Sequence, residues 1–126
     1  MARILVAEDE VPMREFIRRA LAARGHDVVA VGDGAEAVRW LGRQPFDLLL
    51  TDIGMPNMDG VELALKAARD WPGLRLLMMS GLTMERQQAH GIGQLAMAVL
   101  QKPFTMVWLN EAVDRALVTP PAGADV

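Results

Sequence analysis

The chain has 126 residues, of which 52% are hydrophobic, and its 13 basic and 16 acidic residues give a formal net charge of −3. This length fits one domain with a core of its own, and the lack of any run of Lys and Arg disfavours a surface for nucleic acid or for an anionic membrane. The absence of cysteine excludes disulfides and thiolate metal sites.

The N-terminal segment MARILVAEDE carries a charge at its third residue and two acids by its ninth, unlike a secretory signal peptide. No apolar stretch approaches the roughly 18 residues that would suggest a membrane span. We therefore expect a cytoplasmic protein in which residues 1–118 form the domain and the Pro-rich residues 119–126 form a flexible tail.

Short apolar runs of strand length alternate with segments in which apolar residues recur every three or four positions. Such alternation predicts an α/β fold of the flavodoxin-like kind, a five-stranded parallel sheet of order 2-1-3-4-5 with helices on both faces. In chain order the predicted elements are a strand at 3–7, a helix at 11–24, a strand at 28–31, a helix at 35–41, a strand at 48–51, a helix at 61–68, a strand at 74–79, a weakly patterned helix at 83–91, a strand at 97–100 and a helix at 109–117.

Four acids fall at the ends of two of these strands. Glu8, Asp9 and Glu10 follow the first strand, and Asp52 follows the third. In open α/β sheets ligands bind beyond the carboxyl ends of the strands, and neighbouring strands lie about 5 Å apart. Like charges at that distance stay close only if one is protonated or a cation lies between them, and Mg²⁺ suits carboxylate oxygens. The alternative is that these acids are merely solvated.

A hydroxyl and an ammonium group are predicted at the same edge. Ser80 follows the fourth strand, and Lys102 follows the fifth, directly before Pro103. With Mg²⁺, Lys102 would neutralise a phosphoryl group on Asp52, and Ser80 would donate a hydrogen bond to it. The combination predicts an aspartyl phosphate.

The set Glu8-Asp9, Asp52, Ser80 and Lys102-Pro103-Phe104 resembles the receiver domain of two-component response regulators, over residues 3–118. The resemblance implies that a histidine kinase or a phosphotransfer protein donates the phosphoryl group to Asp52. It also implies that the chain is not an enzyme with an independent substrate, and catalyses only its own phosphorylation and dephosphorylation.

By this resemblance, Asp9 and Asp52 are Mg²⁺ ligands, Glu8 acts beside them through water, and the backbone carbonyl of Gly54 completes the protein's share of the metal shell. Ser80 is the switch hydroxyl. Lys102 pairs with the phosphoryl group, and the resemblance implies a cis bond between Lys102 and the proline that follows it.

Two positions bear on how a signal would leave the site. Val99 stands three residues before Lys102, where many receivers carry an aromatic ring that reports phosphorylation. Switching is therefore expected to involve the loop at 81–83 and the helix at 83–91. Leu82 and Gly54 occupy positions that govern water access to the phosphoryl group in this family, and neither can position a water by hydrogen bonding, so the phosphoryl lifetime stays open.

The predicted output is a change of surface that a protein partner recognises, because no residues remain for an output domain, and the chain is expected to be a monomer or weak dimer. Met84, Met106 and Trp108 are candidates for that surface, since Trp is enriched at interface hot spots. The alternative is that they close over the core.

The stretches ILVAEDEVPMREFI, PFDLLLTDIGMPNMDGVELA and VLQKPF are similar to those of CpdR-type regulators of alphaproteobacteria. These single-domain receivers bind, when unphosphorylated, to a ClpXP-type protease. The resemblance thus implies a protease of this type as a possible partner.

Three alternatives share part of this pattern. A phosphatase of the haloacid dehalogenase class would need a second Asp where Gly54 stands, and a flavodoxin-like cofactor carrier would need a Gly-rich first loop where the chain has EDEVPM. The third is a receiver domain excised from a longer response regulator or hybrid kinase.

Overall fold

The computed structural model describes residues 1–55, 57–81 and 98–121. It contains a five-stranded sheet of order β2-β1-β3-β4-β5 in which every neighbouring pair is parallel, so the predicted fold class is confirmed. The elements are β1 (Arg3–Ala7), α1 (Val11–Ala23), β2 (Asp27–Val31), α2 (Gly34–Leu41), β3 (Leu48–Asp52), α3 (Gly60–Asp70), β4 (Arg75–Ser80), β5 (Ala98–Gln101) and α5 (Met106–Val118).

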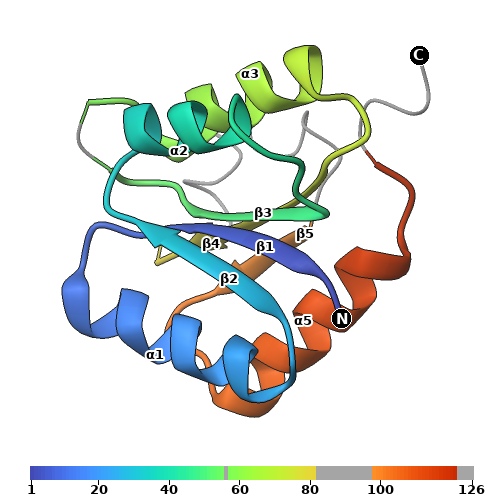
Figure 1. Cartoon of the computed structure of the whole chain (residues 1–126). Coiled ribbons are helices and arrows are strands. Elements are labelled where there is room, and N and C mark those ends of the chain that lie inside the picture. The colour runs from blue at the N-terminus through green and yellow to red at the C-terminus, as the bar shows by residue number, and fades with distance from the viewer. Residues whose placement is uncertain (56, 82–97, 122–126) are drawn as a thin grey trace.

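Helices cover both faces of the sheet. Figure 1 shows α2 and α3 together on one face and α1 and α5 on the other. The connection that leaves β1 runs through α1 on one face, whereas the connection that enters β3 runs through α2 on the other. The strands β1 and β3 are neighbours in the sheet. This arrangement creates the crevice at the carboxyl ends of β1 and β3 where ligands bind in such sheets.

The core consists of two layers, one on each face of the sheet. All five residues of β3 are buried, and its side chains alternate between the two layers. The layer under α1 and α5 includes Ile4, Leu48 and Leu50, and the layer under α2 and α3 includes Leu5 and Leu49. A continuous apolar run is what a strand covered on both faces requires.

Three strands, β3, β4 and β5, end one residue later than the sequence predicted. Asp52 pairs with Met79 and Ser80 pairs with Gln101, so the two polar residues close their strands and do not begin the loops. The last helix begins at Met106, three residues before the predicted start, because the hydroxyl of Thr105 accepts a hydrogen bond from Trp108 N at 3.1 Å.

The helix predicted at 83–91 lies outside the described residues. Among the residues described, no helix has the length and apolar character needed to cross a bilayer. Thr119, the first residue of the predicted tail, accepts a hydrogen bond at its carbonyl from Arg75 Nε at 2.9 Å.

Candidate functional site

Asp52 is the last residue of β3 and is buried. The chain turns directly after it: Ile53 N donates to Met79 O at 3.1 Å, and Gly60 N donates to Ile53 O at 2.7 Å. A Cβ on Gly60 would collide with the carbonyl oxygen of Asp52, so this close return of the chain requires glycine. The turn thus holds the Asp52 backbone from both sides.

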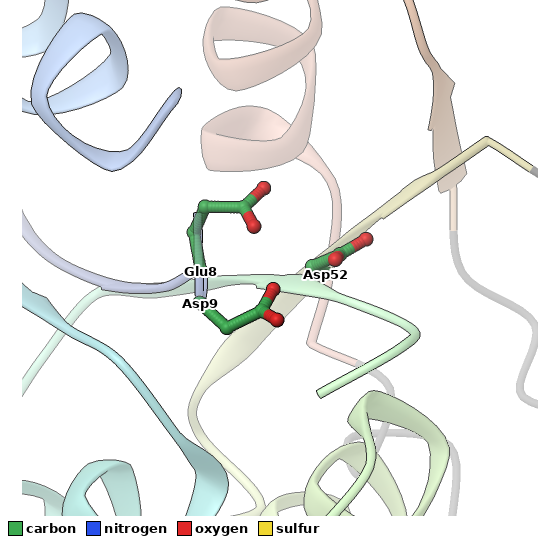
Figure 2. Close-up of side chains that lie close together, drawn as sticks. All are labelled: Glu8, Asp9 and Asp52. Atoms are coloured by element: carbon green, nitrogen blue, oxygen red, sulfur yellow. The ribbon is translucent and has the colours of Figure 1, made fainter. Parts of the chain in front are cut away.

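Three carboxylates meet at this point. Glu8, Asp9 and Asp52 each offer an oxygen, and these oxygens all lie within 4.8 Å of one another. Figure 2 shows Glu8 and Asp9 leaving the end of β1 on opposite sides, with Glu8 on the side of α1 and α5. Glu8 is fully buried, whereas Asp9 is exposed. The predicted meeting of acids from the first and third strands is present.

Lys102 brings a cation to the acids. Its Nζ lies 2.6 Å from Glu8 Oε1 and 3.4 Å from Asp52 Oδ1. Its backbone N donates to Ser80 O at 2.7 Å, which ties the end of β5 to the end of β4, and the predicted cis bond to Pro103 is present. The sequence predicted this ammonium at the site, but it did not predict that the shorter contact would be to Glu8.

Burial governs the electrostatics of the site. Removal from water raises the pKa of Asp52, and the charge of Asp9 raises it further, although Lys102 opposes both. Burial also raises the pKa of Glu8, against the hydrogen bond from Lys102. For Lys102, burial alone would lower the pKa, but the hydrogen bond to Glu8 and the charge of Asp52 outweigh it and the pKa is raised. When all three carboxylates are ionised they face the one ammonium of Lys102, and a divalent cation would neutralise the remaining negative charge.

The donor set fits Mg²⁺, which prefers carboxylate and carbonyl oxygens and keeps several waters. Asp9 and Gly54 are exposed, so water reaches the site from their side. A Cβ added to Gly54 would meet nothing within 4 Å, so the loop leaves open space beside its backbone. Glu8, Asp9, Asp52 and the carbonyl of Gly54 are the groups that could hold the ion directly or through water.

The remaining predicted residues lie in different surroundings. Ser80 is buried at the end of β4, beside Gln101. Val99 is half-buried on β5 and packs against the core layer under α2 and α3. Met106 and Trp108 are 52% and 57% exposed on α5. Leu82 and Met84 lie outside the described residues, so their predicted roles stay predictions, as does the switch through residues 81–91.

One contact at the site was missed by the sequence analysis. Arg14 Nη1 donates to the backbone oxygen of Glu8 at 3.1 Å. Nothing in the spacing of the helix at 11–24 singled this residue out, because the contact depends on how α1 sits against the end of β1.

The chain matches the family model described as response regulator receiver domain over residues 4–114. It is 38% identical over 118 residues to the response regulator receiver protein CpdR of Brucella abortus, covering 94% of this chain and 98% of that protein. It is 35% identical over 123 residues to the DNA-binding transcriptional regulator NtrC of Azospirillum brasilense, covering 96% of this chain but only 26% of that protein.

Solved structures agree with this similarity. The chemotaxis protein CheY4 of Vibrio cholerae gives a TM-score of 0.84 at 26% identity, over 92% of this chain and 98% of that chain. The response regulator TrrA of Thermotoga maritima, solved in complex with Mg(2+)-BeF, gives 0.81 at 26% identity, over 92% and 99%. The chain therefore belongs to the response regulator receiver domain family of two-component systems, in which phosphorylation and Mg²⁺ are general features.

Proposed function

We propose that the chain accepts a phosphoryl group on Asp52 from a histidine kinase or phosphotransfer protein. The observation that carries this proposal is the meeting of Glu8, Asp9 and Asp52 within 4.8 Å, with Lys102 Nζ 3.4 Å from Asp52 Oδ1. A carboxylate oxygen of Asp52 attacks the donor's phosphorus, the P–O bond forms, and the P–N bond to the donor imidazole breaks as that ring leaves.

Each of the chain's own groups has a separate task in this transfer. The partly buried ammonium of Lys102 is close enough to turn from Asp52 to an oxygen of the incoming phosphoryl group. Ser80 presents a hydroxyl from the next strand. Mg²⁺, held by Asp9, Asp52 and the Gly54 carbonyl with Glu8 beside them, supplies charge neutralisation when bound. We further propose that the chain turns over no substrate other than its own aspartyl phosphate.

We expect phosphorylation to depend on Mg²⁺. Without the cation, the phosphoryl group must approach three carboxylates and a single ammonium, which is electrostatically unfavourable. The measurement is intact-protein mass after incubation with a small phosphodonor, in Mg²⁺ and in excess chelator. The native chain should gain one phosphoryl group in Mg²⁺ only. Equal gain in chelator, or no gain where a control receiver is labelled, would contradict the proposal.

We propose that the output is a protein contact, and that a ClpXP-type protease is the first partner to test. The similarity to CpdR along nearly the whole length of that protein supports this choice. The side chains at the start of α5, Met106, Val107 and Trp108, are apolar and exposed, with Met106 beside α1 and Trp108 beside β5, and are available to such a partner. Because Val99 provides no aromatic ring, Ser80 and the loop after it are proposed to carry the change to this surface.

Trp108→Ala is expected to weaken partner binding about tenfold or more while leaving phosphorylation intact, because a buried interface Trp commonly contributes over 1.4 kcal/mol. The measurement is binding of the unphosphorylated chain to the purified protease. Leu65→Ala is the matched control, since Leu65 is a similarly exposed apolar residue, 52%, on α3 across the sheet. Unchanged binding on loss of Trp108 would remove α5 from the proposed partner surface.

A further inference from the structure

Arg14 connects α1 to the peptide that carries the site's acids. It lies in the first turn of the helix, and its side chain reaches back so that Nη1 donates to Glu8 O at 3.1 Å. That oxygen belongs to the peptide joining Glu8 to Asp9. The hydrogen bond therefore fixes the plane of this peptide. From it the Glu8 carboxylate turns towards Lys102, and the Asp9 carboxylate remains exposed beside Asp52.

The guanidinium group of Arg14 lies against the backbone of Gly32. A Cβ built on Gly32, directly after β2, would lie 2.8 Å from Arg14 Nη1. Since real Cβ contacts are longer than that, a side chain at this position would force the end of Arg14 to shift from its present place. The room for Arg14 thus exists because residue 32 is glycine.

The turn that carries Gly32 is itself fixed on two sides. Asp33 Oδ1 accepts from Glu36 N at 2.8 Å and so caps α2, and Asp33 Oδ2 accepts from Asn57 Nδ2 at 3.4 Å. Asn57 belongs to the loop between β3 and α3, which also contains Gly54. Arg14 therefore rests on a turn that is bonded to the loop that carries Gly54.

We propose that Arg14, seated over Gly32, is a positioning residue that fixes the Glu8–Asp9 peptide and so directs Asp9 towards the metal site. This inference rests on the proposed function, because it assigns Arg14 a part in the Mg²⁺ site described there. Arg14 itself does not touch the ion. Partners that orient metal ligands in this way are worth about 10- to 100-fold in metal affinity.

Positioning and simple charge predict opposite results. If Arg14 acted only as a nearby cation, its removal would make the acid site more negative and Mg²⁺ would bind more tightly. If Arg14 positions Asp9, its removal loosens a ligand and Mg²⁺ binds more weakly. The sign of the change in affinity therefore distinguishes the two explanations.

The experiment is a Mg²⁺ titration of the unphosphorylated full chain at constant pH and ionic strength, followed by the backbone amide shifts of Asp9 and Gly54. Arg14→Met is expected to raise the dissociation constant about tenfold. Gly32→Ala, which keeps the charge but displaces the guanidinium, should raise it in the same direction. The double variant should be no weaker than Arg14→Met, because both changes break one arrangement. Arg14→Lys should recover part of the affinity, since an ammonium can still donate to Glu8 O.

The matched control is Arg19→Met, which removes a cation from the same helix at a position that is 76% exposed and paired with Glu15 at 3.8 Å. Its dissociation constant should stay the same or fall slightly. Mg²⁺ binding by Arg14→Met that is equal to or tighter than native would overturn the proposal. If that variant fails to fold, native affinity in Gly32→Ala overturns it equally.

Failure of the proposed function gives a different result. A native chain that binds Mg²⁺ but is never labelled on Asp52 would contradict phosphoacceptance and leave the role of Arg14 standing. A native chain whose amide shifts do not respond to millimolar Mg²⁺ would overturn both.

Discussion

Lys102→Met is expected to lower the free energy of unfolding by about 3 kcal/mol, because removing one partner of a buried ion pair leaves the other charge uncompensated. Glu8 is completely buried and its oxygen lies 2.6 Å from the Lys102 ammonium, so its carboxylate loses its nearest cation. Asp52, 3.4 Å from the same ammonium, loses its cation as well.

The loss should depend on pH in a defined direction. Burial already raises the pKa of Glu8, and without Lys102 that pKa rises further. A carboxyl whose pKa is higher in the folded state than in the unfolded state favours folding below the unfolded value, and this contribution is lost as the pH rises through the folded value. The deficit of Lys102→Met should therefore be largest at neutral pH and smaller near pH 4 to 4.5, about the range of unfolded carboxyls.

The measurement is denaturant unfolding of Lys102→Met at neutral pH and at about pH 4 to 4.5. Two further variants are compared with it. Glu8→Gln combined with Lys102→Met should recover much of the stability, because it removes the orphaned charge. Lys66→Met is the matched control: Lys66 lies 2.7 Å from Asp70 at the surface, with the two side chains 33% and 34% exposed, and should cost only about 0.5 kcal/mol. A Lys102 variant as stable as the Lys66 variant would contradict the buried pair.

Asp52→Asn is expected to abolish phosphorylation and yet stabilise the chain in the absence of Mg²⁺. Its loss of labelling is complete because the amide is no nucleophile for phosphorus. Its gain in stability follows from burial, which raises the pKa of Asp52, with Asp9 adding to the effect. Above that pKa the charged carboxylate opposes folding, so an uncharged side chain of the same shape removes the penalty at neutral pH.

Thermal unfolding without Mg²⁺ should show a melting temperature a few degrees above native at pH 7, and the difference should shrink as the pH falls through the native pKa of Asp52 and vanish below its unfolded value. Adding Mg²⁺ should raise the native melting temperature by mass action and that of the variant much less. Asp27→Asn is the control, since the Asp27 side chain is 69% exposed. A variant less stable than native by an amount independent of pH would contradict this electrostatic account.

Much of the fold was predictable because its signals are local. The runs at β1, β3 and β4 are apolar almost without interruption, which is the pattern of strands covered on both faces, and helical spacing lies between them. Parallel strands deliver their carboxyl ends to one edge. The meeting of Asp9, Asp52 and Lys102 therefore followed from residue order alone.

The finer geometry was not predictable, because it depends on tertiary packing. The sequence predicted that Lys102 would lie near several acids. Its closest partner is Glu8, because the Glu8 side chain turns to the side of α1 and α5, where it meets the ammonium. Nothing in the sequence distinguishes Arg14 from the other polar residues of its helix. Helical side chains lean towards the N-terminus, and here the lean brings Arg14 onto Glu8 O only because Gly32 leaves room.

The central claim is that Asp52 itself receives the phosphoryl group. Borohydride reduces an acyl phosphate to the alcohol, so a phosphorylated aspartate becomes homoserine, which survives digestion. After labelling in Mg²⁺, reduction and trypsin, the acids of the site fall into separate peptides, residues 4–14 with Glu8 and Asp9 and residues 44–66 with Asp52. We predict homoserine at position 52 and an unmodified 4–14 peptide. Homoserine at Asp9 or at another acid, with position 52 unchanged, would contradict the account.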